Sequence, residues 1–176
     1  MRKLLALLLL LISLLPLTAA ELNSNFDLSL GATFMRSKIY TDTLNARSSL
    51  SAELRITPFL IGSEKLKGGL YLNGVYTTPT FIYQSTRYDG SLKGGFGASL
   101  YYTFTNAISA ELSAGTSLGY FVLSKDECAS IDASLAIEAH PFQFLSLISR
   151  ATLSFESDRT SLAFKVGARF TQEREI

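Results

Sequence analysis

Few residues of this sequence are of a type that supports catalysis. The chain has one histidine, His140, and one cysteine, Cys128. Glu138 precedes His140 by two residues and could orient its imidazole, as a carboxylate does in hydrolases with a serine nucleophile. The spacing implies no serine within reach, however, and a histidine before Pro141 is typical of a turn. We therefore predict that the chain is not an enzyme.

Metal and cofactor chemistry is not indicated either. Cys128 is a single cysteine, and no group of His and Cys residues has the spacing of a metal site. The 16 basic and 15 acidic residues nearly balance and form no basic cluster, so nucleic acid is not expected as a partner. The sequence predicts no metal, no cofactor and no disulfide.

The other ionisable residues follow a different pattern. Many of them stand at alternate positions of apolar segments, each on the side away from the apolar stripe. Acids and bases are nearly equal in number on that side, as an interior filled with ion pairs requires. We predict that these residues form a structural charge network: Asp27, Glu53, Arg55, Lys93, Glu111, Asp132, Glu138, Arg150, Glu156, Lys165 and Arg169.

Alternating segments of this kind must position the network. In SLAFKVGARF, residues 161–170, every second residue is apolar, which is the period of a β-strand. On a helix, Glu111, Asp132 and Arg150 would fall among apolar neighbours. Eight such segments, with turn residues between them, predict an antiparallel meander of eight strands. The segments are 26–34, 50–56, 70–76, 92–104, 108–122, 129–139, 147–155 and 161–170.

The two faces of these strands differ enough to indicate their surroundings. A soluble barrel hides its apolar face, whereas a membrane barrel turns that face to lipid and keeps polar groups in its lumen. The polar face is rich in small residues, such as Gly95, Gly97 and Ser113, which suit a crowded lumen better than a solvent-exposed surface. The sequence therefore predicts an all-β fold, an eight-stranded antiparallel up-and-down transmembrane β-barrel.

The N-terminal segment has the anatomy of a cleavable signal peptide. Arg2 and Lys3 precede an apolar run from Leu4 to Leu15, which is too short to span a bilayer as a helix. Small residues end the segment at Ala20, where cleavage is expected. The predicted organisation is a signal peptide at 1–20, a transmembrane barrel at 21–170 and a periplasmic tail at 171–176.

An even number of strands places both ends of the barrel on the periplasmic side. The expected periplasmic turns are 58–68, 105–107 and 140–143, and the expected outer connections are 37–47, 77–90, 124–127 and 157–160. The connection TTPTFIYQSTRYDG is rich in aromatic residues, which suggests contacts with an extracellular ligand through Phe81, Tyr83, Arg87 and Tyr88. The alternative is a hairpin extension stabilised by cross-strand aromatic pairs.

The signal peptide, the eight amphipathic strands and the late segment VGARF resemble the small eight-stranded outer-membrane barrels, which include the OmpA transmembrane domain, OmpX and OmpW. The resemblance is one of pattern and extends over the chain from residue 21. It implies a monomer in the outer membrane of a Gram-negative-type envelope, in contact with outer-membrane lipids. It also implies that the barrel-assembly machinery reads the region of Phe170, although TQEREI follows that residue here.

Three functions are compatible with this pattern. The first is a structural or surface-interaction role through the outer loops, with a lumen plugged by ion pairs. The second is a small porin or a channel for hydrophobic solutes, which would use Tyr71, Val75 and Tyr101 in the lumen. The third is a secreted or periplasmic soluble β-barrel that binds an apolar ligand inside, as lipocalins do.

Overall fold

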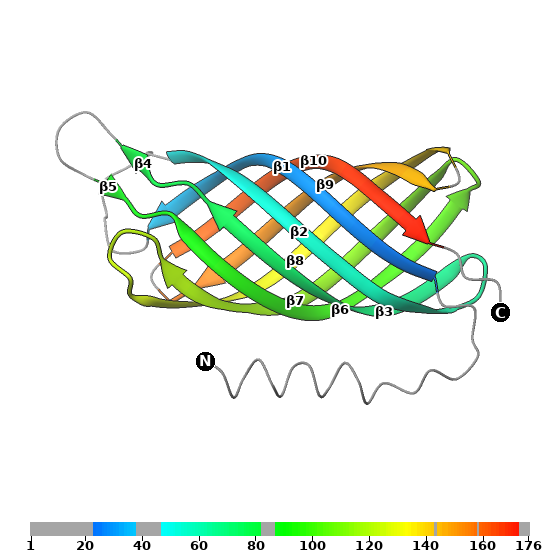
Figure 1. Cartoon of the computed structure of the whole chain (residues 1–176), viewed down its shortest axis with the longest axis horizontal. Helices are drawn as coiled ribbons and strands as arrows, with labels where there is room; N and C mark the ends of the chain where they lie inside the picture. Colours follow the sequence, from blue (N-terminus) through cyan, green and yellow to red (C-terminus); the bar gives the residue numbers. More distant parts are fainter. Residues whose placement is uncertain (1–22, 38–46, 82–86, 143, 158, 173–176) are drawn as a thin grey trace.

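The computed structural model describes residues 23–37, 47–81, 87–142, 144–157 and 159–172, and the predicted signal peptide lies outside these ranges. The chain forms a closed antiparallel barrel of eight long strands (Figure 1), as the alternation predicts. The barrel strands are β1 (Asn23–Ser37), β2 (Arg47–Gly62), β3 (Leu66–Thr77), β6 (Ser91–Thr105), β7 (Ile108–Phe121), β8 (Glu127–Phe142), β9 (Leu145–Glu156) and β10 (Arg159–Gln172). A ribbon of β4 (Thr80–Phe81) and β5 (Arg87–Tyr88) completes the described elements.

The barrel closes because its first strand pairs with its last. Neighbours in the barrel are neighbours in the sequence, and β1 pairs with β10 from Ser24↔Gln172 to Ser37↔Arg159. Both ends of the barrel chain therefore lie at one rim, which we call the terminal end (Figure 1). The β4–β5 ribbon extends from the opposite rim, which we call the loop end.

The polarity of the barrel is inside out relative to a soluble protein. Leu112 and Phe164 face outward with 60% and 52% of their surface exposed, whereas the adjacent Glu111 and Lys165 face the lumen with 1% and 3% exposed. A soluble barrel that holds an apolar ligand would need the reverse arrangement. Within the described ranges there is no helix of membrane-spanning length and hydrophobicity.

Seven of the eight barrel strands are longer than the predicted segments, β7 ends one residue earlier than predicted, and the turns at the terminal end are shorter. The prediction of a turn at 58–68 is wrong, because β2 continues through Pro58 to Gly62. The pairing register of β2 with β3 shifts between Ile56 and Phe59, and such a bulge lets a proline without an N–H remain in the strand. Gly62 then turns the chain with φ 149°, and a Cβ there would lie 2.2 Å from the Leu66 carbonyl oxygen.

Two further boundaries differ from the prediction. His140 lies in β8, not in a turn, because this strand runs past a register shift between Ala139 and Phe142. The last strand, β10, begins at Arg159 and ends at Gln172, so it includes the first two residues of the predicted tail. Each extension adds residues that point alternately into the lumen and outward, which changes the composition of the site.

The connection after β3 contains the predicted outer-loop contacts. Thr80 pairs with Tyr88 and Phe81 with Arg87, so this segment includes a hairpin extension. Tyr83 lies outside the described residues, as do the side chains of Phe81, Arg87 and Tyr88. The carboxylate of Asp89 accepts hydrogen bonds from the backbone N–H groups of Leu123 and Ser124, at 2.6 and 2.7 Å, and so ties this connection to the turn before β8.

Candidate functional site

The lumen holds a network of ion pairs centred on Glu111 of β7. Its carboxylate accepts hydrogen bonds from three guanidinium groups, Arg55 at 2.6 Å, Arg150 at 2.9 Å and Arg169 at 2.5 Å. These arginines come from β2, β9 and β10, so the contacts cross the barrel interior instead of following neighbouring strands. At most 2% of each of these four residues is exposed.

Two further carboxylates extend the network towards the terminal end. Asp27 of β1 accepts hydrogen bonds from Arg169 at 2.6 Å and from Arg150 at 2.8 Å. Glu138 of β8 accepts one from Arg169 at 2.8 Å. One guanidinium, that of Arg169, therefore binds three carboxylates at once.

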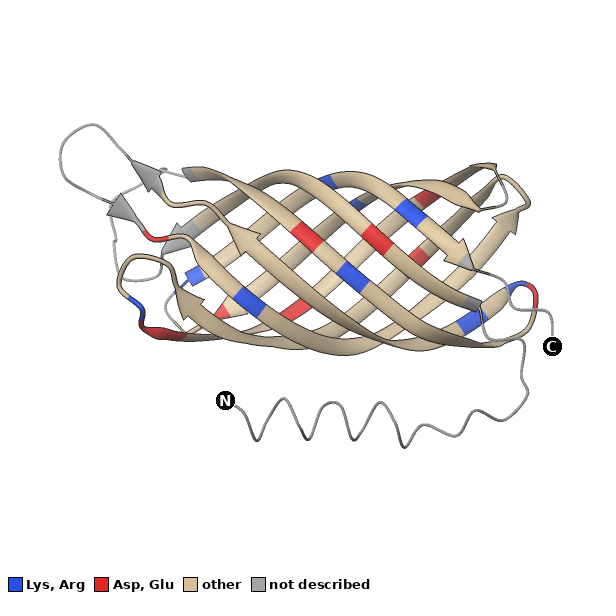
Figure 2. Ribbon diagram, in the orientation of Figure 1, with Lys and Arg blue, Asp and Glu red and all other residues tan. Residues whose placement is uncertain are grey.

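Towards the loop end, Glu53 completes the network. It pairs with Lys165 at 2.8 Å, with Arg55 at 3.1 Å and with Arg150 at 3.7 Å. Acidic and basic side chains are thus equal in number in this central network. Figure 2 shows acidic and basic positions on several strands between the two rims of the barrel. Its members are Asp27, Glu53, Glu111, Glu138, Arg55, Arg150, Lys165 and Arg169.

Two buried tyrosines fill the space that remains around the arginines. The guanidinium of Arg55 lies over the Tyr71 ring at 4.0 Å, and that of Arg169 lies 5.0 Å from the centre of the Tyr101 ring. A Cβ on Gly97 would approach the Tyr71 ring to 2.6 Å, so this close contact requires glycine. Both aromatic rings proposed for an apolar path therefore pack against cations.

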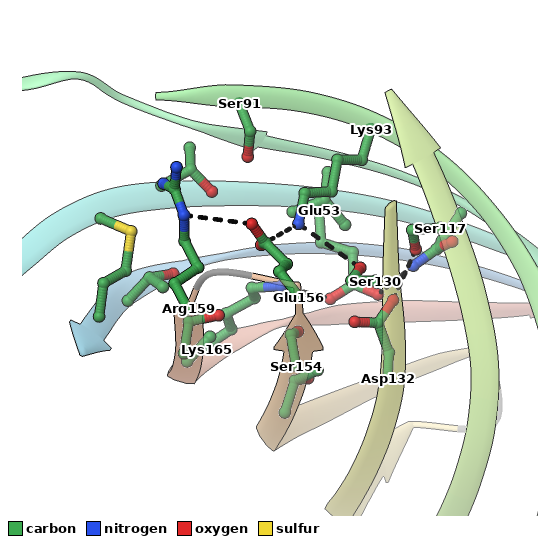
Figure 3. A pocket seen from close by; sticks show the side chains of 18 of the residues that line it. Glu53, Ser91, Lys93, Ser117, Ser130, Asp132, Ser154, Glu156, Arg159 and Lys165 are labelled. Atoms are coloured by element: carbon green, nitrogen blue, oxygen red, sulfur yellow. Dashed lines mark hydrogen bonds and ion pairs between the residues drawn. The ribbon is translucent and has the colours of Figure 1, made fainter. Parts of the chain in front are cut away.

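A separate group of charges lies between the central network and the loop end. Lys93 of β6 and Arg159 of β10 both pair with Glu156 of β9, Arg159 at 3.3 Å (Figure 3). They line a cavity of about 50 Å³, whose floor includes Glu53 and Lys165 of the central network. We call this cavity the loop-end chamber. The lumen charges predicted from the sequence do not include Arg159, because residues 157–160 are predicted to form an outer connection. In the structure β10 begins at Arg159, and this places its side chain on the lumen face.

Asp132 also lines the loop-end chamber but differs from the other predicted charges. Its carboxylate accepts a hydrogen bond from the Ser117 hydroxyl at 2.6 Å. No ion pair of Asp132 is present among the described residues. The described part of the chain likewise holds no cluster of three His, Cys, Asp or Glu side chains suited to a metal ion.

His140 lies between two serines, which the sequence analysis did not anticipate. Its Nε2 is 2.9 Å from the Ser109 hydroxyl and its Nδ1 is 2.8 Å from the Ser146 hydroxyl. The inference that no serine is in reach is wrong, because β7 and β9 flank β8 and bring serines from both sides. The Ser109 hydroxyl also donates to Glu138 at 3.1 Å, whereas Glu138 is 3.8 Å from the imidazole.

This arrangement differs from a working hydrolase triad in two respects. The imidazole nitrogen that would face an orienting carboxylate meets a serine hydroxyl instead. The Ser109 hydroxyl is buried, with 4% of the residue exposed, and is shared with a carboxylate that already binds Arg169. The geometry fits a chain of hydrogen bonds that ties three strands together near the terminal end.

Fold and polarity together define the class of molecule, a small eight-stranded β-barrel of the outer-membrane type. Among solved structures, the chain is similar to Ail, the attachment invasion locus protein of Yersinia pestis, with a TM-score of 0.55 and 12% identity over 87% of this chain and 100% of that one. It is also similar to Neisserial surface protein A, with a TM-score of 0.53 and 12% identity over 84% of this chain and 96% of that one.

A third similar structure is the outer membrane enzyme PagL, with a TM-score of 0.51 and 12% identity over 83% of this chain and 98% of that one. No model of a known protein family matches the sequence, and no curated protein matches it. At these identities the similarity establishes the fold of the chain.

Proposed function

We propose that this protein is an integral outer-membrane barrel whose lumen is closed by ion pairs and whose role is structural or one of surface interaction. One observation carries the proposal: apolar side chains cover the outside of all eight strands while the charged side chains pair inside. An exterior of this kind is stable in the hydrocarbon core of a bilayer. The ionised groups in the lumen are stable because they form ion pairs with one another. The outer-membrane barrels of similar fold support the location.

Aromatic side chains at the terminal end support a membrane interface there. Tyr102 packs against Phe104 and Phe142 against Phe144, and all four residues face outward. Outer-membrane barrels carry aromatic girdles at the level of the lipid headgroups. The predicted signal peptide would supply the export that this location requires.

The channel alternative is less well supported by the lumen. An eight-stranded barrel is only just wide enough for its own side chains, and here four arginine and lysine side chains and two tyrosines occupy its centre. The rings of Tyr71 and Tyr101 contact guanidinium groups, so they offer no continuous apolar path for a hydrophobic solute.

Planar-bilayer recordings of the folded chain test the closed lumen. We expect little or no steady conductance from the native protein, because paired charged side chains occupy the centre of a narrow lumen. The double variant Arg55→Ala, Glu111→Ala removes a cation and an anion joined at 2.6 Å, keeps the net charge and should admit ions more often. Large, stable single-channel steps from the native protein would contradict the proposal, as would release of the folded chain without detergent in cell fractionation.

The loop end is the surface that we propose for contacts outside the cell. The β4–β5 ribbon projects from this rim, and Asp89 anchors its base to the neighbouring turn. Ail, a barrel of similar fold, has been crystallised with the heparin analogue sucrose octasulfate, so a barrel of this fold can bind a soluble ligand.

Replacement of Phe81, Tyr83, Arg87 and Tyr88 by serine tests this surface. We expect the variant barrel to fold normally, because Phe81, Arg87 and Tyr88 lie in the β4–β5 ribbon and not in the barrel strands. We also expect it to lose retention on immobilised polysaccharides or extracellular-matrix proteins. Equal retention of the native and variant proteins on every surface would contradict a role of these residues in binding. Their role would then be to stabilise the hairpin extension.

We propose no catalytic role for the chain. The name of PagL shows that an outer-membrane barrel of similar fold is compatible with catalysis. In this chain, however, both serines in contact with His140 are buried, and Ser109 is also bound to Glu138, so an incoming ester would have to displace these contacts.

A further inference from the structure

We propose that the loop-end chamber binds a small monovalent cation at Asp132. The carboxylate of Asp132 lines this chamber and has the Ser117 hydroxyl as its hydrogen-bond donor. An ionised carboxylate in a partly buried site is costly unless a positive charge balances it. Four basic side chains line the chamber, but within the described residues none of them pairs with Asp132: Lys93 and Arg159 pair with Glu156, and Arg55 and Lys165 pair with Glu53.

Two buried oxygen atoms that could contribute to a cation site also line the chamber. Asn73 Oδ1 and Thr152 Oγ1 are buried and have no hydrogen-bond partner, and both residues line the chamber. Thr152 is only 9% exposed. A buried oxygen without a donor requires an explanation, and a bound water or ion is one such explanation.

Gly95 leaves a small space beside Asn73 Oδ1 and Ser117 Oγ. A Cβ at this position would lie 2.3 Å from Ser117 Oγ and 2.5 Å from Asn73 Oδ1, so both oxygens surround the same small volume. Ser117 in turn contacts Asp132 at 2.6 Å. The oxygens of Asp132, Asn73 and Ser117 therefore lie close together. Figure 3 shows Asp132 beside Ser117 and Ser130 in the chamber.

The charge of the surroundings determines the class of ligand. One carboxylate with neutral oxygens balances a single positive charge, whereas tight Ca²⁺ sites use several carboxylates and Mg²⁺ requires a strict octahedral shell. Arg55, Lys93, Arg159 and Lys165 also line the cavity, and these cations would repel a divalent ion about twice as strongly as a monovalent one. The volume of about 50 Å³ exceeds what one water needs but excludes a bulky organic cation.

Thermal unfolding of the full chain in detergent micelles tests this site. Unfolding temperatures are compared at constant ionic strength in the chlorides of sodium, potassium, methylammonium and N-methylglucamine. We expect a saturable rise in Tm with a small cation over N-methylglucamine, because a ligand of the folded state stabilises it by mass action. Methylammonium chloride tests whether the site prefers a primary ammonium group to an alkali-metal ion. The cation that raises Tm more is the preferred ligand.

Three variants locate the effect. Asp132→Asn should abolish the dependence of Tm on cation identity, and Thr152→Val should weaken it with little change of volume. Asp126→Asn removes a carboxylate from an exposed turn and should leave the dependence intact. If Asp132→Asn does not fold, the line width of ²³Na resonances in native and Thr152→Val protein gives an independent measure of binding.

Several results would overturn the proposal. The same Tm in all four salts would mean that water alone fills the chamber, and an unchanged cation dependence in Asp132→Asn would place the ion elsewhere. Stabilisation by MgCl₂ beyond that by sodium at equal ionic strength would show that the class of ligand is wrong. None of these results depends on whether the lumen conducts, so this inference can fail while the proposed function stands.

Discussion

Replacement of Arg169 by methionine should lower the free energy of unfolding by about 3–5 kcal/mol, the cost of breaking a buried ion pair from one side. Arg169 binds Asp27, Glu111 and Glu138, and only 1% of its surface is exposed. Asp27 and Glu111 keep Arg150, but Glu138 loses the one arginine or lysine with which it pairs among the described residues. Methionine fills much of the volume, so the expected loss reflects charge more than a cavity.

Reversible urea unfolding in lipid vesicles measures this loss. Lys65→Met, in an exposed turn at the terminal end, is the matched control and should change stability by a few tenths of a kcal/mol. The double variant Arg169→Met, Glu138→Gln should recover part of the loss, because it removes the carboxylate that the first change leaves unpaired. Equal stability of Arg169→Met and Lys65→Met would show that the central network does not hold the barrel together.

The period of two in the sequence determined most of the fold. A strand has only two faces, so one clearly apolar stripe in each segment assigns every residue to the inside or the outside. The prediction of an eight-stranded antiparallel barrel is confirmed for this reason. Alternation does not define where a strand ends, however, and the bulge at Pro58 and the long β8 therefore differed from the prediction.

The closed barrel, and not the local sequence, determines which charged side chains pair with each other in the lumen. Arg55 and Glu111, 56 residues apart, meet across the lumen, whereas Asp27 and Arg169, 142 residues apart, are register partners because the barrel closes between β1 and β10. Ser109 and Ser146 reach His140 because β7 and β9 flank β8. The sequence can therefore assign a residue to the lumen, whereas the choice of partner requires the register of all eight strands.

Replacement of Leu135 by arginine should destabilise the folded protein in a bilayer by about 2–4 kcal/mol, the cost of a cation near the midplane on the lipid face of a barrel. Leu135 faces outward with 54% of its surface exposed and pairs with Leu112 and Ala151 in the middle of neighbouring strands. Unfolding titrations in vesicles measure the change. Leu123→Arg is the matched control, because Leu123 is also exposed but lies in the turn at the loop end, where the cost should fall to about 0–1 kcal/mol. Equal effects at the two positions would mean that water, and not hydrocarbon, surrounds the middle of the barrel.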